Sequence, residues 1–201
     1  KQMVGVLLPY YRQTRTERLI ATGRLVVAAF SLVAIYLDAY EPSRYEQIAY
    51  SALAAYLVYA AVIVALLWSS LTPPIRLPLI THVVDLAAFF VLIYFTEGPT
   101  SPFFVYFVFA LISATLRWHW QGALWTAAVA LSGFIGLGVY TGEVLQDPGF
   151  QLNRFVIRSV YVAVVAVLLG YLGEHQERLQ REISELASWP VGLSEEAANL
   201  V

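Results

Sequence analysis

The sequence predicts an all-α membrane protein, a bundle of six transmembrane helices with both termini cytoplasmic, which continues into a parallel coiled-coil helix. Three observations predict this fold. Hydrophobic residues make up 59% of the 201 residues and charged residues only 13%, against about 45–50% and about 25% in soluble domains. The apolar residues come in long blocks without period-two alternation, which favours helices over a β-barrel. Lysine and arginine gather in alternate loops, as in multi-pass membrane proteins.

Six apolar blocks are the expected spans, each close to the ~20 residues that an α-helix needs to cross a ~30 Å hydrocarbon core. They cover residues 19–40, 48–68, 79–96, 102–116, 122–140 and 155–172. The fourth is the shortest, and Arg117 and Trp118 are expected to extend it by snorkelling towards the interface. Basic residues precede the first span, lie between spans two and three and between four and five, and follow the sixth. Both termini are therefore expected on the cytoplasmic side.

Two short features lie around these spans. Residues 1–18 are expected to form a cytoplasmic or interfacial segment, because the apolar run around Pro9 is too short to cross a membrane and the proline would break it. In the fifth span, Ala128, Ser132 and Gly136 recur at four-residue spacing, which lets helices approach closely. These three residues are expected either to pack within the six-helix domain, residues 19–172, or to form a contact in a dimer.

Residues 173–190 are expected to form a signalling coiled coil. Apolar residues follow the sixth span in alternating steps of three and four, which is the spacing of a heptad seam. The seam comprises Leu172, Gln176, Leu179, Ile183 and Leu186. Pro190 is expected to end this helix, and residues 191–201 to begin a further cytoplasmic domain. A frayed tail is the alternative.

Few ionisable groups lie inside the expected spans, and such groups are functional hypotheses by default. His82 and Asp85 share one face of the third span, three residues apart. Arg24 lies at a similar depth in the first span, so Asp85 is expected to pair with it, directly or through His82 or water. The pair then either positions helices or couples protons or a quinone to signalling.

The sequence offers no catalytic apparatus. It has no cysteine, and its three histidines are dispersed, so no metal site is expected. Phosphate-binding loops, nucleophile elbows and kinase motifs do not occur. The net charge of −2 gives no reason to expect a nucleic-acid partner. The first partner that the sequence predicts is the lipid bilayer.

A motif in the loop between the third and fourth spans carries a family resemblance. The loop reads Glu97-Gly98-Pro99-Thr100-Ser101-Pro102-Phe103. With the six spans and the coiled-coil exit, over residues 19–186, it resembles the sensor module of bacterial histidine kinases, in particular the redox-responsive RegB/PrrB type. That family has Gly-Gly-x-x-Asn-Pro-Phe in this loop. Gly98, Pro102 and Phe103 match, whereas Glu97 replaces the first glycine and Ser101 the asparagine.

The resemblance implies a homodimeric sensor in the bacterial inner membrane that signals to a response regulator through a kinase portion beyond this chain. It also implies quinone as a possible ligand. The residues expected around that ligand are Gly98, Ser101, Pro102, Phe103, Phe104 and Arg158. A helical hairpin turn explains most of the loop residues equally well. The front end of a membrane-bound nucleotide cyclase, of the diguanylate cyclase type, and a small transporter or channel subunit are the alternative functions.

Overall fold

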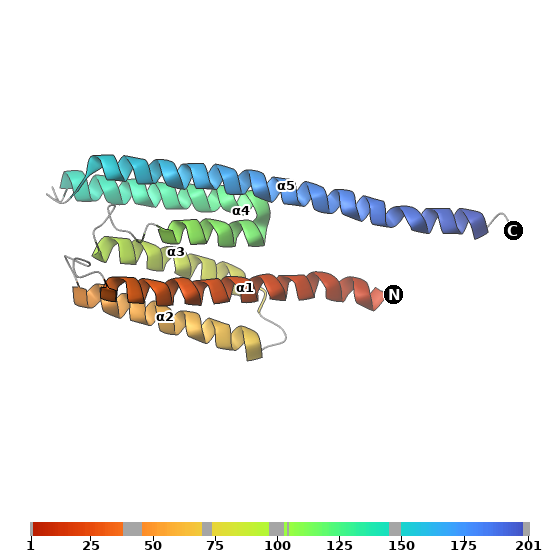
Figure 1. Cartoon of the computed structure of the whole chain (residues 1–201), viewed down its shortest axis with the longest axis horizontal. Helices are drawn as coiled ribbons and strands as arrows, with labels where there is room; N and C mark the ends of the chain where they lie inside the picture. The colour runs from red at the N-terminus through yellow and green to blue at the C-terminus, as the bar shows by residue number, and fades with distance from the viewer. Residues whose placement is uncertain are drawn as a thin grey trace.

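The protein is built from helices alone in the part of the chain that the structure, a computed structural model, describes. The described residues are 2–37, 46–69, 74–96, 103, 105–144 and 150–198. The helices are α1 (Gln2–Leu37), α2 (Glu46–Ser69), α3 (Leu77–Phe95), α4 (Val105–Val139), the π-helical turn η3 (Tyr140–Val144) and α5 (Leu152–Ala198) (Figure 1). The all-α prediction is therefore confirmed.

The helix α4 folds back on itself at Trp118 and His119. Trp118 has φ −128° and ψ 18°, and His119 has φ 55° and ψ −147°, so neither residue is helical. The two arms of α4 run side by side in opposite directions (Figure 1). Gly122 lies where the arms meet, and a Cβ atom there would lie 2.6 Å from the Ala114 carbonyl oxygen. The connection expected between spans four and five is thus a tight corner.

Among the described residues, four helical segments are long and apolar enough to cross a membrane. They are Gln47–Ser69, Leu77–Phe95, Tyr106–Glu143, which includes the α4 corner, and Leu152–Glu185. Large apolar side chains such as Phe30 and Trp125 are about three-quarters exposed on the outside of the bundle, as lipid contact requires. The exact number of crossings stays a prediction.

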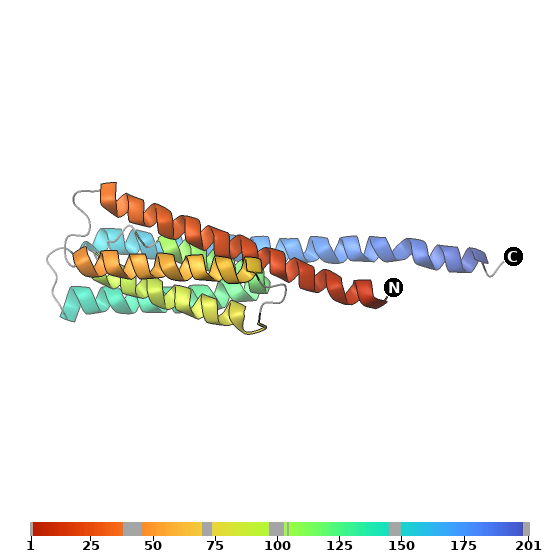
Figure 2. The ribbon, with the colours of Figure 1, turned by 90° about the horizontal axis from the view of Figure 1, so that it is seen from below.

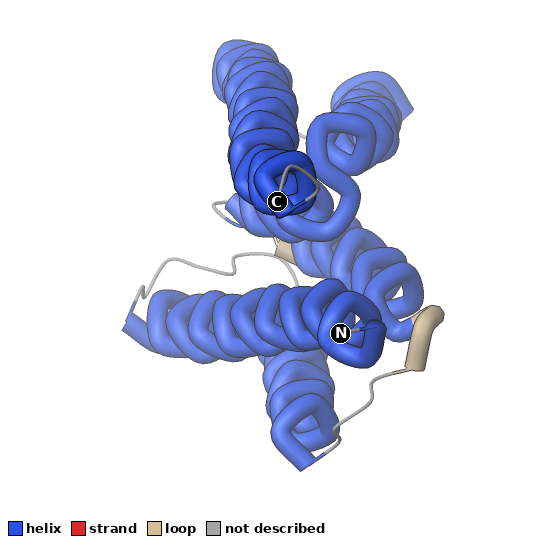
Figure 3. The backbone as a smooth tube through the Cα atoms, turned by 90° about the vertical axis from the view of Figure 1, so that its right-hand side faces the viewer, coloured by secondary structure: helices blue, strands red, loops and turns tan. Residues whose placement is uncertain are grey.

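The helices form two close pairs with α3 between them. α1 packs on α2, α4 packs on α5, and α3 contacts both α2 and α4; Figure 3 views this arrangement along the bundle. The largest core cluster is rich in aromatic rings, with Phe89, Tyr106, Phe107 and Phe134 fully buried. The start of α1 and the end of α5 project from the same end of the bundle (Figure 2). That this end of the bundle faces the cytoplasm stays a prediction.

Two expected helix breaks are wrong. α1 runs through Pro9, and α5 runs through Pro190 to Ala198. An interior proline removes one backbone hydrogen bond, but a helix can continue past it with a kink. Residues 2–13 and 173–198 are therefore extensions of bundle helices.

The small residues of α4 face outwards. Ala128, Ser132 and Gly136 are all exposed, and a Cβ at Gly136 would meet nothing within 4 Å. Elsewhere in the second arm of α4, a Cβ at Gly133 would clash with the Phe90 ring, and one at Gly138 with the Phe155 ring. Of the two interpretations of the stripe, packing inside the bundle is wrong, and a dimer contact stays a prediction.

Candidate functional site

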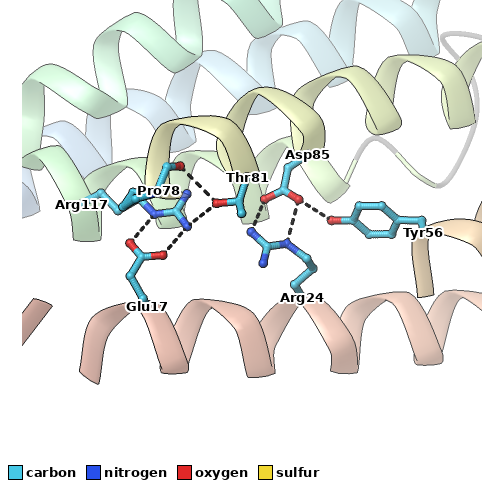
Figure 4. A network of polar contacts seen from close by, with 7 residues as sticks. All are labelled: Glu17, Arg24, Tyr56, Pro78, Thr81, Asp85 and Arg117. Carbon is cyan, nitrogen blue, oxygen red and sulfur yellow. Dashed lines mark hydrogen bonds and ion pairs between the residues drawn. The ribbon is translucent and has the colours of Figure 1, made fainter. Parts of the chain in front are cut away.

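A polar strip on α3 is the centre of the candidate site. The helix is apolar along most of its length, but Pro78, Thr81 and Asp85 follow one another at steps of three and four residues and are all buried. This spacing places them on one face. The face looks towards α1, whose Glu17 and Arg24 are also buried (Figure 4).

Arg24 and Asp85 form a direct, two-pronged ion pair. Arg24 Nε donates to Asp85 Oδ1 at 2.8 Å and Nη2 donates to Oδ2 at 2.7 Å, with side chains 1% and 0% exposed. The Tyr56 hydroxyl on α2 donates to Asp85 Oδ1 at 2.9 Å. The Arg24 guanidinium also lies over the Tyr59 ring, 5.7 Å from its centroid. The pairing expected from depth in the membrane is therefore present, and the group joins α1, α2 and α3.

A second ion pair joins α1 to the first arm of α4. Arg117 Nε donates to Glu17 Oε1 at 2.8 Å, and Nη2 donates to Oε2 at 2.7 Å. Nη2 also donates to Thr81 Oγ1 at 3.0 Å, and Thr81 donates to the Pro78 carbonyl at 3.2 Å. Both charged side chains are under 5% exposed. Because Arg117 reaches Glu17 and Thr81 at once, it binds α1 to α3 and α4.

Sequence reasoning missed this second pair. It assigned Glu17 to a segment outside the spans and Arg117 to the interface. The sequence did contain a signal for it. Glu17 and Arg117 carry opposite charges, each lies within two residues of an apolar block, and both are at ends expected on the same side of the membrane. The pair would have been found by extending the depth comparison past the span boundaries.

The two pairs have opposite polarity along α1. Glu17 and Arg24 are seven residues, or about two turns, apart on α1, and they face Arg117 and Asp85 respectively. If α1 slid until Glu17 reached the place of Arg24, two carboxylates would meet in a buried setting. Like charges repel strongly there, so the pairs fix the register of α1 against α3 and α4.

His82 belongs to a different contact. Its Nε2 lies 2.9 Å from Thr126 Oγ1 on the second arm of α4, and its ring meets Trp118 edge to face at 5.2 Å. The direct contact between Arg24 and Asp85 means that His82 does not mediate the pair. It links α3 to the α4 corner instead.

The residues expected around a quinone are only partly described. Gly98, Ser101, Pro102 and Phe104 lie outside the described residues. Phe103 is 5% exposed and packs beside Tyr106, with ring centroids 6.1 Å apart. Arg158 is half-buried on α5. Whether these residues share a site stays a prediction.

The seam residues of α5 face outwards. Leu172, Leu179 and Ile183 are 47%, 44% and 64% exposed, and Gln176 is exposed as well. The side chain of Leu186 lies outside the described residues. These apolar side chains interrupt an otherwise charged surface, and the pairing of two such seams stays a prediction.

The polar network pairs each of its carboxylates with an arginine, and a role of the Arg24–Asp85 pair in coupling protons or a quinone to signalling stays a prediction. Both its carboxylates are occupied by guanidinium groups, and the described residues contain no group of three acids or histidines that could hold a metal ion. Buried ion pairs are costly unless further hydrogen bonds support them. Tyr56 donates one to Asp85 and Thr81 accepts one from Arg117, while Arg117 Nη1 has no partner among the described residues. The network therefore holds four bundle helices in one fixed arrangement.

Changing Tyr56 to phenylalanine tests how much the hydrogen bond from Tyr56 to Asp85 contributes to stability. Tyr56→Phe keeps the ring but removes the hydroxyl that donates to Asp85, so we expect the protein to lose about 1–2 kcal/mol of stability. The measurement is the thermal unfolding midpoint of the purified protein in detergent. Tyr59→Phe is the matched control, because the Tyr59 hydroxyl has no hydrogen-bond partner among the described residues. Equal midpoints for the two variants would contradict a role for Tyr56 in the network.

Comparison with known proteins identifies one family. A family model described as a PilS-like transmembrane domain, a six-transmembrane module, matches residues 10–184. No curated protein and no solved structure matches the chain. The match begins inside α1, before Glu17, and ends in α5, so it includes both ion pairs and most of the seam.

Proposed function

Because this chain belongs to the family of PilS-like transmembrane domains, we propose that it is the six-helix membrane sensor module of a bacterial sensor histidine kinase. In this proposal the module lies in the bacterial inner membrane with both termini cytoplasmic. It regulates a kinase portion that follows it, and that portion passes phosphoryl groups to a response regulator.

The observation that carries the proposal is the continuity of α5. It is a single helix of 47 residues that packs on α4 in its first part and leaves the bundle as a lone charged helix in its second part (Figure 1). A stiff helix of this kind transmits a rotation or a slide from a membrane bundle to a following domain. A module that only anchored a protein would not need such a rigid connection.

The seam of α5 supports a homodimer. Leu172, Gln176, Leu179 and Ile183 follow heptad spacing and are exposed. Two parallel copies would bury these apolar side chains against each other, and the polar Gln176 would fix the register at some loss of stability. Dimerisation also brings two kinase portions together below one pair of bundles.

The polar network supplies the fixed part of the proposed switch. The two ion pairs hold α1, α2, α3 and the first arm of α4 together. α5 instead packs against α4 through close contacts between glycine and aromatic rings, as at Gly138 and Phe155. In this proposal α5 is the moving part of the switch, and it shifts against the group of helices that the ion pairs hold together.

Helix-phase insertions test the signalling role. The full chain is joined through α5 to the catalytic portion of a histidine kinase, and autophosphorylation is measured in membrane vesicles. Inserting four residues after Gln176 rotates the output relative to the bundle, whereas inserting seven restores the heptad phase. We expect the four-residue insertion to change the activity severalfold and the seven-residue insertion to leave it near the parent value. Activity that is the same for all three proteins would contradict signalling through α5.

We also propose quinone as a ligand beside the loop between α3 and α4, on the resemblance of residues 97–103 to the quinone-linked motif. The aromatic rings of Phe103 and Tyr106 pack against each other directly after this loop, and quinone sites are lined mainly by apolar and aromatic side chains. The test extracts quinone from purified protein and compares Phe103→Leu with Phe109→Leu, which changes a ring inside α4, farther from the loop. Equal quinone retention in the two variants would count against this ligand.

A further inference from the structure

A cleft lies where α5 leaves the bundle. It has a volume of about 440 Å³ and is lined by Trp120, Glu174, Glu177, Arg178 and Arg181. Trp120 begins the second arm of α4, directly after the corner at His119. Gly173 brings α5 against this corner, since a Cβ there would lie 3.0 Å from the Trp120 backbone nitrogen. The cleft is therefore built by two elements in close contact.

The cleft lies where the exposed apolar surface of α5 ends, which is the level expected for a membrane interface. The exposed apolar surface of α5 reaches Tyr171 and Leu172, which are 71% and 47% exposed, and Glu174 is the first charged residue after them. Trp120 is 39% exposed at the same level. Tryptophan side chains favour the headgroup region, where one part of the ring is dry and the other wet. A lipid headgroup is thus the molecule that meets this cleft first.

The charges of the cleft match a headgroup that carries both signs. Arg178 lies 3.7 Å from Glu174, and Arg181 pairs with Glu177, but three of these four side chains are more than 60% exposed. Exposed pairs of this kind are worth little, so the guanidinium groups are available to another anion. Arginine binds phosphate with two parallel hydrogen bonds, and the two carboxylates accept hydrogen bonds from an ammonium group.

The cleft stays open if α5 dimerises. Its four charged residues are spaced three, one and three residues apart, so they share one face of α5. At about 100° per residue, the seam of Leu172, Gln176, Leu179 and Ile183 lies on the opposite face. A partner helix on the seam would therefore leave the cleft uncovered.

We propose that this cleft binds the headgroup of an aminophospholipid, with phosphate on Arg178 and Arg181 and the primary ammonium on Glu174 and Glu177. Trp120 packs against the glycerol region. The bound lipid pins α5 at the point where it leaves the membrane. This site is separate from the polar network and from the loop between α3 and α4.

The test counts lipids on the intact chain by native mass spectrometry after release from nanodiscs. The discs contain phosphatidylethanolamine, phosphatidylglycerol or phosphatidylcholine in turn. We expect the chain to retain phosphatidylethanolamine about tenfold better than the other two, because only its headgroup satisfies both charge types with hydrogen bonds. Preferential retention of phosphatidylglycerol or of phosphatidylcholine, or equal retention of all three, would overturn the proposal.

Matched variants locate the binding. Replacing Arg178 and Arg181 together with glutamine is expected to lower phosphatidylethanolamine retention about tenfold, through loss of charge-assisted hydrogen bonds. Arg154→Gln is the control, since Arg154 is an exposed arginine at the other end of α5. The double variant changes only exposed side chains, and an unchanged unfolding midpoint shows that it folds. Retention equal to that of the control would place the lipid elsewhere and overturn the assignment.

A wash separates a lipid site from a site for free phosphate. Inorganic phosphate added before release is expected to leave the bound phosphatidylethanolamine in place, because the lipid also holds the ammonium and apolar contacts. Complete displacement by inorganic phosphate would show that the arginines bind phosphate alone, which contradicts an aminophospholipid site.

Discussion

Replacing Asp85 with alanine is expected to destabilise the protein by about 3–5 kcal/mol, the usual effect of removing one partner of a buried ion pair. Arg24 is 1% exposed and would be left in the core without its carboxylate. The Tyr56 hydroxyl would lose its acceptor as well. We expect a lower unfolding midpoint in detergent and a smaller yield of folded protein in membranes.

A double variant shows whether Asp85→Ala destabilises the protein because the attraction between Arg24 and Asp85 is lost or because Arg24 is left buried without a partner. Arg24→Met with Asp85→Leu removes both charges and keeps an apolar filling of similar size. Because buried ion pairs can often be exchanged for apolar residues at little loss, we expect the double variant to be more stable than Asp85→Ala alone. A double variant as unstable as the single one would mean that the pair itself, and not the unpaired arginine, determines stability. Asp85→Asn in the kinase fusion then shows whether the charge has a signalling role.

Replacing Gly122 with alanine is expected to destabilise the α4 corner by about 3 kcal/mol, at the upper end of overpacking effects. The new Cβ would lie 2.6 Å from the Ala114 carbonyl oxygen and 2.8 Å from Trp118 Cβ. The first of these is a backbone atom, so the clash is relieved only if the two arms of α4 move apart. Such a movement would also disturb Arg117, next to the corner, and its pairing with Glu17.

Gly136→Ala is the matched control on the same helix. A Cβ at Gly136 would meet nothing within 4 Å, and alanine has the better helix propensity. We expect its unfolding midpoint to equal or exceed that of the parent protein. If both variants unfolded at the same temperature as the parent, the close approach of the two arms at Gly122 would be contradicted.

The sequence predicts α2 and α3 well, since the apolar blocks at residues 48–68 and 79–96 lie within two residues of their bounds, whereas α1 and α5 run far past their blocks. Each apolar block needs about the same number of residues to cross the hydrocarbon core, and the blocks are separated by charges. Helix ends at prolines were predicted less well. Pro9 and Pro190 both lie inside helices, because a proline weakens a helix locally and the flanking residues decide whether it continues.

Of the two ion pairs in the candidate site, the sequence predicted only the one whose partners lie at the same expected depth in the membrane. Arg24 and Asp85 lie at similar depths in the spans expected at residues 19–40 and 79–96, so the high free energy of isolated charges in a membrane predicts their pairing. Glu17 and Arg117 lie at span ends, where water is an equally good alternative, and their contact depends on how α1 is tilted against α4. The positive φ of His119 and the approach at Gly122 depend on the packing of two arms, which no local pattern encodes.

The spacing of the ion pairs along the chain has a consequence for biosynthesis. Arg24 lies 61 residues before its partner Asp85, and Glu17 lies 100 residues before Arg117. When α1 first emerges, neither of its buried charges has a counter-charge, and an isolated charge resists entry into lipid. If α1 crosses the membrane as the sequence predicts, we expect it to reach its final depth only after α3 and the first arm of α4 have been synthesised. The first helix to be made would then be among the last to settle.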